Sequence, residues 1–211
     1  ACAITEAAGV GSDQRRHDLL EGLRAMPDAL GAVLAEREAI ADVARRFAPP
    51  KRYWAVVGNG HNLVAAEEIR IKLSELCYKS IASDVTEDKK HIDLSSEPMI
   101  LVCAAGLSGS NADDVAKEVA IYRAHKATPI VIATEDEERF TAALRVVTVP
   151  VVRPELAFVL TTVVGHLFGY EAALAIDAQA RPLREARGSI EAALADATAA
   201  SDTDRMLAEL R

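Results

Sequence analysis

The stretch that decides the fold is "VVGNGHNLVAAEEIRIKLSELC", residues 56–77. It reads as the end of an apolar strand, a glycine turn and a helix. A dinucleotide fingerprint would need a glycine where the chain has Leu63, and a P-loop would end in GK[ST], so both nucleotide motifs are excluded. A strand-turn-helix unit still places a ligand near helix N-terminal amides, which makes Gly58, Asn59 and Gly60 candidate binding residues. A plain tight turn without a ligand is the alternative.

Outward from this stretch, short apolar runs alternate with helical stretches. We expect strands at 53–58, 80–85, 98–105, 129–134 and 146–152, and helices at 62–78, 112–125, 139–144 and 154–175. Such alternation is typical of a parallel sheet with helices on both faces. The sequence therefore predicts an α/β fold, a three-layer, doubly wound, mostly parallel five-stranded sheet.

The two ends of the chain are predicted to be helical additions to this sheet. Helical spacing after Ser12 or Asp13, one of which is the expected N-cap, predicts two or three helices with a break at Pro27. The expected domains are N-terminal interdomain-type helices over 1–50, the α/β domain over 51–176, and a weakly packed C-terminal tail and helix over 177–211.

Composition bounds the function. The chain has 211 residues, 50% hydrophobic and 27% charged, which suffices for one sizeable core. A net charge of -8 argues against nucleic-acid and acidic-membrane partners, because nothing would neutralise their phosphates. The apolar run over 155–176 contains two glycines, a histidine, two threonines and, besides Glu155 at its start, Glu171, so we expect a buried core helix and no membrane span.

The cysteines and the start of the chain carry further expectations. Cys2, Cys77 and Cys103 form an odd set without a CxxC pair, which predicts neither disulfides nor a metal site and fits a reducing cytoplasm. No cofactor motif is present in the sequence. No basic n-region marks a signal peptide. The chain begins without methionine, which would suit a piece of a longer protein.

A second loop, in "ILVCAAGLSGSNADDVAKEVA" (100–120), joins a buried strand to a helix. Ser108, Gly109, Ser110 and Asn111 offer hydroxyls, an amide and backbone N–H groups, the donors that a phosphate monoester needs. Ser110 or Asn111 could instead only cap the helix, with the two following aspartates complementing its dipole. Those aspartates would also repel a dianion, and the residues by themselves favour capping.

Three ionisable residues of the helix over 62–78 share one face. Glu68, Lys72 and Glu75 lie four and three residues apart, a spacing that a solvated ladder of ion pairs would also show. His91, in "TEDKKHIDL", is either an exposed loop histidine or a catalyst. A base, a cation and a histidine near a phosphate loop would suit proton transfer next to a sugar carbonyl.

From residue 18 to residue 187 the chain resembles the second half of the isomerase portion of glucosamine-6-phosphate synthase, a sugar isomerase (SIS) domain of flavodoxin-like fold. The specific residues are "KLSELCY" (72–78), with the family's Lys-x-x-Glu followed by aromatics, and the downstream "KKH". The resemblance implies that Glu75 moves the proton between C1 and C2 and that Lys72 assists it. It also implies that His91 opens the sugar ring in a site shared between two subunits.

Three positions depart from the family pattern. The loop "GLSGSNADD" resembles SxSGxT, but Gly106 replaces the leading serine and Asn111 the threonine. A C-terminal lysine that captures the ketose should fall near Arg187, and arginine cannot form a Schiff base. Lys72 could stabilise the enediolate, or instead lower the pKa of the Glu75 base too far.

The resemblance implies half of a phosphosugar isomerase or aminotransferase, which converts fructose 6-phosphate towards glucosamine 6-phosphate. The family's first SIS domain and its glutaminase are absent from these residues, so the chain alone is expected to be incomplete. A homodimer with a hexose phosphate ligand is the expected assembly. The alternative is a non-catalytic phosphosugar-binding module for regulation or dimerisation.

Overall fold

The computed structural model describes residues 2–91 and 94–196, and its centre is a five-stranded sheet in the order β2-β1-β3-β4-β5. All four strand pairs are parallel. The strands are β1 (Trp54–Gly58), β2 (Ala82–Asp84), β3 (Met99–Cys103), β4 (Thr128–Thr134) and β5 (Arg145–Val149). The predicted α/β class and the five parallel strands are confirmed.

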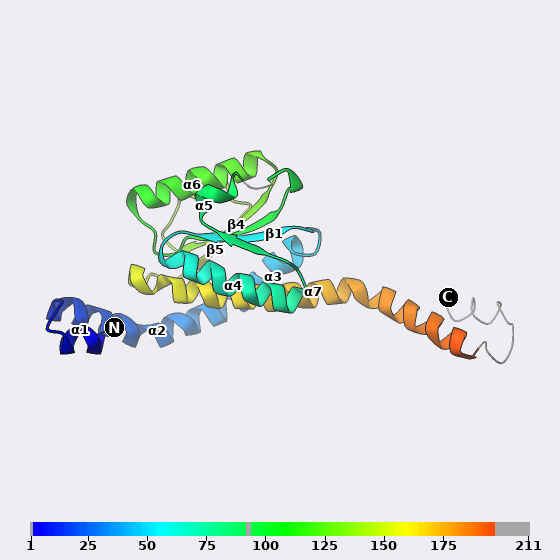
Figure 1. Ribbon diagram of the computed structural model, residues 1–211, viewed down its shortest axis with the longest axis horizontal. Helices are drawn as coiled ribbons and strands as arrows, with labels where there is room; N and C mark the ends of the chain where they lie inside the picture. The colour runs from blue at the N-terminus through cyan, green and yellow to red at the C-terminus, as the bar shows by residue number, and fades with distance from the viewer. Residues whose placement is uncertain (1, 92–93, 197–211) are drawn as a thin grey trace.

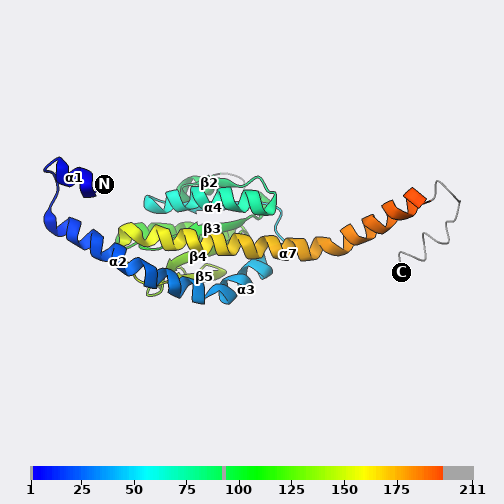
Figure 2. The ribbon, with the colours of Figure 1, turned by 90° about the horizontal axis from the view of Figure 1, so that it is seen from below.

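Helices cover both faces of the sheet (Figures 1 and 2). In chain order, the described helices are α1 (Cys2–Ala7), α2 (Asp13–Ala35), α3 (Arg37–Phe47), α4 (His61–Cys77), α5 (Thr86–Lys89), the 3-10 turn η1 (Leu94–Ser96), α6 (Gly109–Ala124) and α7 (Pro154–Asp196). Because successive side chains of a strand point to opposite faces, Val56 and Leu101 join the core under α3, α4 and α7. Val57 and Val102 join the second core under α6.

The helix expected over residues 139–144 is absent, and this prediction was wrong. The segment forms turns that lead into β5, and Leu144 already donates its backbone N–H to the carbonyl of Pro129 in the neighbouring strand. Phe140 is buried in the core under α6. Six residues are too few for a helix to form without strong packing, so the sheet and the Phe140 anchor decide the conformation.

The break expected at Pro27 is also absent. Ser12 caps α2 by accepting a hydrogen bond from the N–H of Arg15, as one of the two cap assignments predicted, and α2 then continues through Pro27. Pro27 is exposed, while the helix buries Met26, Ala29 and Val33 against the core. This packing offsets the hydrogen bond that proline removes, which costs roughly 3 kcal/mol in a helix interior.

Helix α7 is the longest element and does not end at residue 175, where the sequence predicted its end. It is the one helix among the described residues that is long and apolar enough to cross a membrane. Its first half is nevertheless a core helix, since Leu160, Val164 and Phe168 are buried and Glu171 pairs with Arg37 at 2.9 Å.

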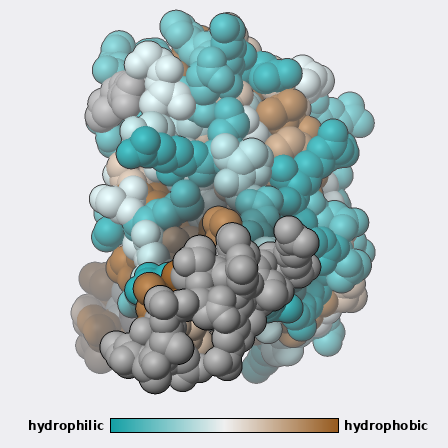
Figure 3. Space-filling view, turned by 90° about the vertical axis from the view of Figure 1, so that its right-hand side faces the viewer, coloured by the Kyte–Doolittle hydropathy of each residue, from teal (hydrophilic) through white to brown (hydrophobic). Residues whose placement is uncertain are grey.

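The second half of α7 extends away from the body (Figures 1 and 2). Seen from the end toward which α7 projects, the surface is mostly hydrophilic, with scattered hydrophobic residues (Figure 3). The helix runs through the boundary expected between residues 176 and 177. The part of the expected tail beyond residue 196 lies outside the described residues, and the division into three domains stays a prediction.

Candidate functional site

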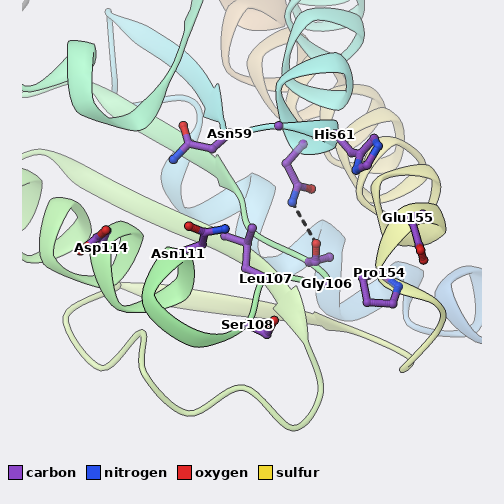
Figure 4. A pocket seen from close by; sticks show the side chains of 12 residues that line it. Asn59, His61, Gly106, Leu107, Ser108, Asn111, Asp114, Pro154 and Glu155 are labelled. Carbon is purple, nitrogen blue, oxygen red and sulfur yellow. Dashed lines mark hydrogen bonds between the residues drawn. The ribbon is translucent and has the colours of Figure 1, made fainter.

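A pocket of about 450 Å³ lies at the carboxyl edge of the sheet, where β1 and β3 diverge into their helices. Strand order reverses at this point, because β2 lies on one side of β1 and β3 on the other; such switch points are the usual ligand sites of open α/β sheets. Twelve residues line the pocket (Figure 4): Asn59, Gly60, His61, Asn62, Ala105, Gly106, Leu107, Ser108, Asn111, Asp114, Pro154 and Glu155.

Three helices begin at this pocket. Helix α4 starts at His61, α6 at Gly109 and α7 at Pro154, each after a strand of the sheet. The first N–H groups of a helix have no partner within it and carry a partial positive charge. At the start of α7, however, Pro154 has no N–H and Leu156 donates its own to the carbonyl of Arg153. The backbone donors for an anionic group therefore come from the starts of α4 and α6.

The two glycines of "GNG" serve different purposes. A Cβ on Gly58 would lie 2.4 Å from the carbonyl oxygen of Asn62, so only glycine lets α4 start so close to β1. Gly60 has φ +57°, a left-handed conformation that glycine adopts without strain. The sequence alone does not separate a ligand turn from a plain turn, and the pocket beside these residues is what favours the ligand turn.

Two asparagines fasten the pocket loops to one another. The Asn59 amide donates to the Thr86 hydroxyl at 2.8 Å and accepts from the Thr86 N–H at 3.1 Å. The Asn62 amide is buried and donates to the carbonyl of Ala105 at 2.9 Å, which joins α4 to the loop after β3 (Figure 4, dashed line). These amides hold the loops in place and are already committed to protein partners.

The loop predicted to bind phosphate begins one residue before α6. Ser108 occupies the N-cap position but makes no side-chain capping hydrogen bond. Ser110 and Asn111 lie inside the first turn of the helix, so neither is the N-cap that the alternative interpretation proposed. Ser108 and Asn111 line the pocket, whereas Gly58, Gly109 and Ser110 lie outside its lining.

The charge of the lining is acidic. Asp114 and Glu155 face the pocket and none of its twelve residues is lysine or arginine. A hydrogen bond from its own backbone N–H, with help from Arg153, lowers the pKa of Glu155, which therefore stays ionised at the start of α7. Asp114 pairs with Lys117 at 3.0 Å. An anion in this pocket would be attracted by helix amides and opposed by two carboxylates.

The predicted base and its cation lie at the other end of α4. The Lys72 ammonium is 3.0 Å from a Glu75 carboxylate oxygen, with the side chains 40% and 59% exposed. This hydrogen bond raises the pKa of Lys72. Fourteen residues of helix separate Glu75 from His61, which is about 21 Å at about 1.5 Å per residue. Glu68, on the same face, has an oxygen 3.2 Å from Nε2 of His166 in α7.

His91 and Arg187 lie in two further places. His91 follows α5, on the opposite face of the sheet from α4 (Figure 1), is 68% exposed and lies 3.8 Å from Glu87. Arg187 lies on the projecting half of α7 and pairs with Glu191 at 2.7 Å. Within the one chain, the structure therefore brings the two pocket loops together but not His91, the Lys72–Glu75 pair or Arg187.

The candidate residues named from the sequence left out eight of the pocket residues: His61, Asn62, Ala105, Gly106, Leu107, Asp114, Pro154 and Glu155. Pro154 followed by an acidic residue, directly after a predicted strand, is a typical helix start. The predicted helix over 154–175 includes this third N-terminus, but the sequence did not indicate that it lies beside the two loops. Among residues 2–91 and 94–196, no group of three histidine, cysteine or acidic side chains could hold a metal ion.

Comparison with protein families finds no family that matches the chain. Among curated proteins, glutamine–fructose-6-phosphate aminotransferase of Thermus thermophilus is 30% identical over 171 residues, which is 80% of this chain and 28% of that protein. Human glutamine–fructose-6-phosphate aminotransferase (isomerizing) 2 is 24% identical over 132 residues, which is 61% of this chain and 19% of that protein. The chain thus spans less than a third of these relatives.

Solved structures show the same fold. The C-terminal domain of glucosamine-fructose-6-phosphate aminotransferase from Francisella tularensis matches with a TM-score of 0.74 and 18% identity, over 83% of this chain and 50% of that one. The sugar isomerase domain of an RpiR transcription factor from Sphaerobacter thermophilus matches with a TM-score of 0.59 and 13% identity, over 82% of this chain and 98% of that one. The NanR protein of Vibrio vulnificus, complexed with ManNAc-6P, matches with a TM-score of 0.56 and 9% identity, over 88% of this chain and 71% of that one.

These matches agree with three features of the chain: the segment with the glycine turn and "KLSELCY", the parallel sheet, and the pocket at its switch point. In sequence and in fold, the chain is a sugar isomerase (SIS) domain that resembles the C-terminal half of the isomerase portion of glutamine–fructose-6-phosphate aminotransferase.

Proposed function

We propose that this SIS domain supplies the proton-transfer half of a hexose phosphate isomerase or aminotransferase, acting on fructose 6-phosphate towards glucosamine 6-phosphate. The observation that carries the proposal is the Lys72–Glu75 ion pair, at 3.0 Å, displayed on the surface at the end of α4 within "KLSELCY". The similarity to the aminotransferase of Thermus thermophilus supports it.

The chemistry needs both residues of the pair. Moving a proton between C1 and C2 requires a carboxylate base next to the sugar, and Glu75 would take the proton. The enediolate that develops carries negative charge, which the Lys72 ammonium would stabilise. His91 would assist ring opening, and Arg187, which stays protonated, would contribute charge without a Schiff base.

The exposure of Glu75 argues for a second unit. A base that works near neutral pH is partly desolvated, yet 59% of the Glu75 side chain is exposed. The pocket of the same chain is about 21 Å away along α4, too far for Glu75 to act on a sugar held there. A second SIS unit, as a separate domain or as a second copy, would cover Glu75 and present its own bound sugar phosphate to it.

In this proposal the pocket of the chain binds the phosphate group of the sugar. The backbone amides at the starts of α4 and α6, with the side chains of Ser108 and Asn111, would hold the phosphate of a hexose phosphate. Binding energy from this remote group would orient the reacting carbons toward the base of the other unit. A homodimer and a cytoplasmic location are part of the same proposal.

Proton exchange tests the assignment of Glu75. In deuterated buffer with fructose 6-phosphate, proton NMR should show loss of the C1 signal with the full chain, and Glu75→Gln should abolish that exchange. Glu67→Gln, an exposed carboxylate on the same helix, is the matched control and should leave it unchanged. Equal exchange in both variants would reject Glu75 as the base.

A second candidate function is a phosphosugar-binding regulatory module. It is favoured by Arg187 in place of the family's lysine and by the match to almost the whole sugar isomerase domain of the RpiR transcription factor. The ManNAc-6P complex of NanR shows that a protein of similar fold holds a sugar phosphate. Line-broadening of fructose 6-phosphate by the wild-type chain with no exchange at C1, at any protein concentration, would favour this module.

A further inference from the structure

The second half of α7 carries a seam, apolar at five of its six positions, that no described part of the chain covers beyond Ile176. Ile176 still packs against the main core. Beyond it the helix leaves the body (Figures 1 and 2), while Leu183, Ile190 and Leu194 are 76%, 37% and 57% exposed. We define the seam as Ile176, Ala180, Leu183, Arg187, Ile190 and Leu194.

The seam follows a heptad spacing. Its members are separated by four, three, four, three and four residues, the alternation of a seven-residue repeat, whose period of about 3.5 keeps the stripe facing one partner helix. Ile176, Leu183 and Ile190 occupy the d positions, and Ala180, Arg187 and Leu194 the a positions. The core-facing stripe of α7 thus continues beyond the body as a coiled-coil seam.

The projecting half is a poor helix by itself. It contains Pro182 and Gly188, the two residue types least favourable in a helix interior. Neither lies in the seam. An isolated helix of about twenty residues is marginal in water even with good helix formers, so a partner helix would account for both its exposed leucines and its length.

We propose that the projecting halves of α7 from two copies of this chain pair as an antiparallel coiled coil. This inference is independent of the proposed function. With a and d positions facing each other, Leu183 of one copy meets Leu194 of the other, and Arg187 meets Ile190. The same register brings Arg184, which lies at an e position and pairs with Asp177 at 2.6 Å in its own chain, beside Glu191 of the second copy. Each Glu191 would then lie between Arg187 of its own chain and Arg184 of the other.

Charge decides the orientation. In a parallel, in-register pair the two Arg187 side chains would face each other in the seam, and no pair of opposite charges would flank it. In the antiparallel pair Arg187 lies next to an isoleucine and keeps its own ion pair with Glu191, at 2.7 Å within the chain. Electrostatics therefore favour two copies in opposite directions.

Sedimentation of the full chain tests whether the seam pairs two copies of the chain. We expect a concentration-dependent dimer that Leu183→Glu weakens at least tenfold, with unchanged near-ultraviolet circular dichroism, a signal that comes from the aromatic residues of the body such as Trp54. Glu185→Lys, which changes a charge on the outer face of the same segment, is the control and should have no effect. A chain that is monomeric at every concentration would overturn the proposal, as would a dimer that Leu183→Glu does not weaken.

A charge exchange tests the pairing itself. Arg184→Glu should weaken the dimer several-fold because two glutamates would then face each other, and Arg184→Glu with Glu191→Arg should restore it. If the double variant is weaker than Arg184→Glu alone, the antiparallel register is wrong.

Cross-linking distinguishes the orientations. In a Cys2→Ser background, a mixture of Leu183→Cys and Leu194→Cys chains should form the mixed disulfide on mild oxidation, while each variant alone should not. The two Leu183 side chains would lie about 16 Å apart along the antiparallel pair, eleven residues at about 1.5 Å each. Efficient homodisulfides from each variant alone would show a parallel pair. A loss of dimer on removal of residues 197–211, with no cross-link in any mixture, would assign the seam to that segment instead.

Discussion

At the residue scale, the Tyr122 hydroxyl links the second core to the loop beside the pocket. Tyr122 is fully buried in α6 and donates a hydrogen bond to the carbonyl of Thr86, which in turn holds Asn59. Burial raises the pKa of this hydroxyl, with nearby Glu118 adding to the shift. The sequence showed only a tyrosine in a helix, because its partner comes from a segment 36 residues earlier.

The raised pKa predicts a pH dependence of stability. The folded chain holds the Tyr122 proton more tightly than the unfolded chain does, so its contribution is complete below the unfolded pKa of about 10 and falls as the pH rises above it. Burial likewise raises the pKa of Cys77 to about 11, so its contribution to stability also falls as the pH rises above the pKa of the unfolded thiol.

Tyr122→Phe should therefore flatten the loss of stability above pH 10. At pH 7 it should cost about 1 kcal/mol, because the Thr86 carbonyl loses its donor. Urea unfolding between pH 7 and pH 10.5 measures both effects, with the exposed Tyr170→Phe as control. An alkaline slope identical to that of the wild type would contradict the assigned pKa direction.

At the element scale, the approach of α4 to α7 depends on two glycines of α7, and most closely on Gly165. A Cβ on Gly165 would lie 2.3 Å from Cγ1 of Ile69, which is fully buried. Gly165 and Gly169 line the same side of α7, and a Cβ on Gly169 would lie 3.1 Å from Leu73. The sequence predicted a core helix from these glycines, and the structure shows that they set the distance to α4.

Gly165→Ala should destabilise the chain by about 1–3 kcal/mol, since the added methyl forces α4 and α7 apart or Ile69 off its rotamer. Gly31→Ala, in α2 with open space around the position, should stabilise it by about 0.5–1 kcal/mol. Thermal and denaturant unfolding would measure both. Adding Ile69→Ala to Gly165→Ala should cost less than the sum of the single changes; strict additivity would argue against this contact.

At the scale of the whole molecule, the net charge of -8 and the acidic pocket lining oppose anion binding. The helix N-termini must supply the attraction, so the affinity for a sugar phosphate should be sensitive to each nearby carboxylate. Asp114 lines the pocket at the first turns of α6, where its charge acts at short range.

Asp114→Asn should tighten the binding of fructose 6-phosphate about fivefold, a change of about 1 kcal/mol for one charge at surface dielectric. Isothermal titration at low salt measures it, and the effect should shrink as salt is added. Asp42→Asn in α3, outside the pocket lining, controls for net charge. Weaker binding in Asp114→Asn would mean that this carboxylate holds the ligand or the loop.

Much of the fold and part of the site are visible in the sequence. Alternating strands and helices, the glycine turn at Gly58 and Gly60, and the loop at Ser108 follow from apolar periodicity and turn chemistry, which are local properties. The Lys72–Glu75 pair also follows, since three residues of helix bring the two side chains to one face. What the sequence by itself determined are these elements and the residue pairs within them.

Only the tertiary structure decided which of these residues meet. The helix expected over residues 139–144 does not form, because Leu144 bonds to Pro129 in β4 and Phe140 is buried in the core. Pro27 stayed inside α2 because packing on its buried face outweighed the lost hydrogen bond. The pocket lies at the N-terminal end of α4, away from the Lys72–Glu75 pair, because three helix starts converge at that edge of the sheet. Such convergence is set by contacts between residues far apart in the chain, and no local pattern encodes it.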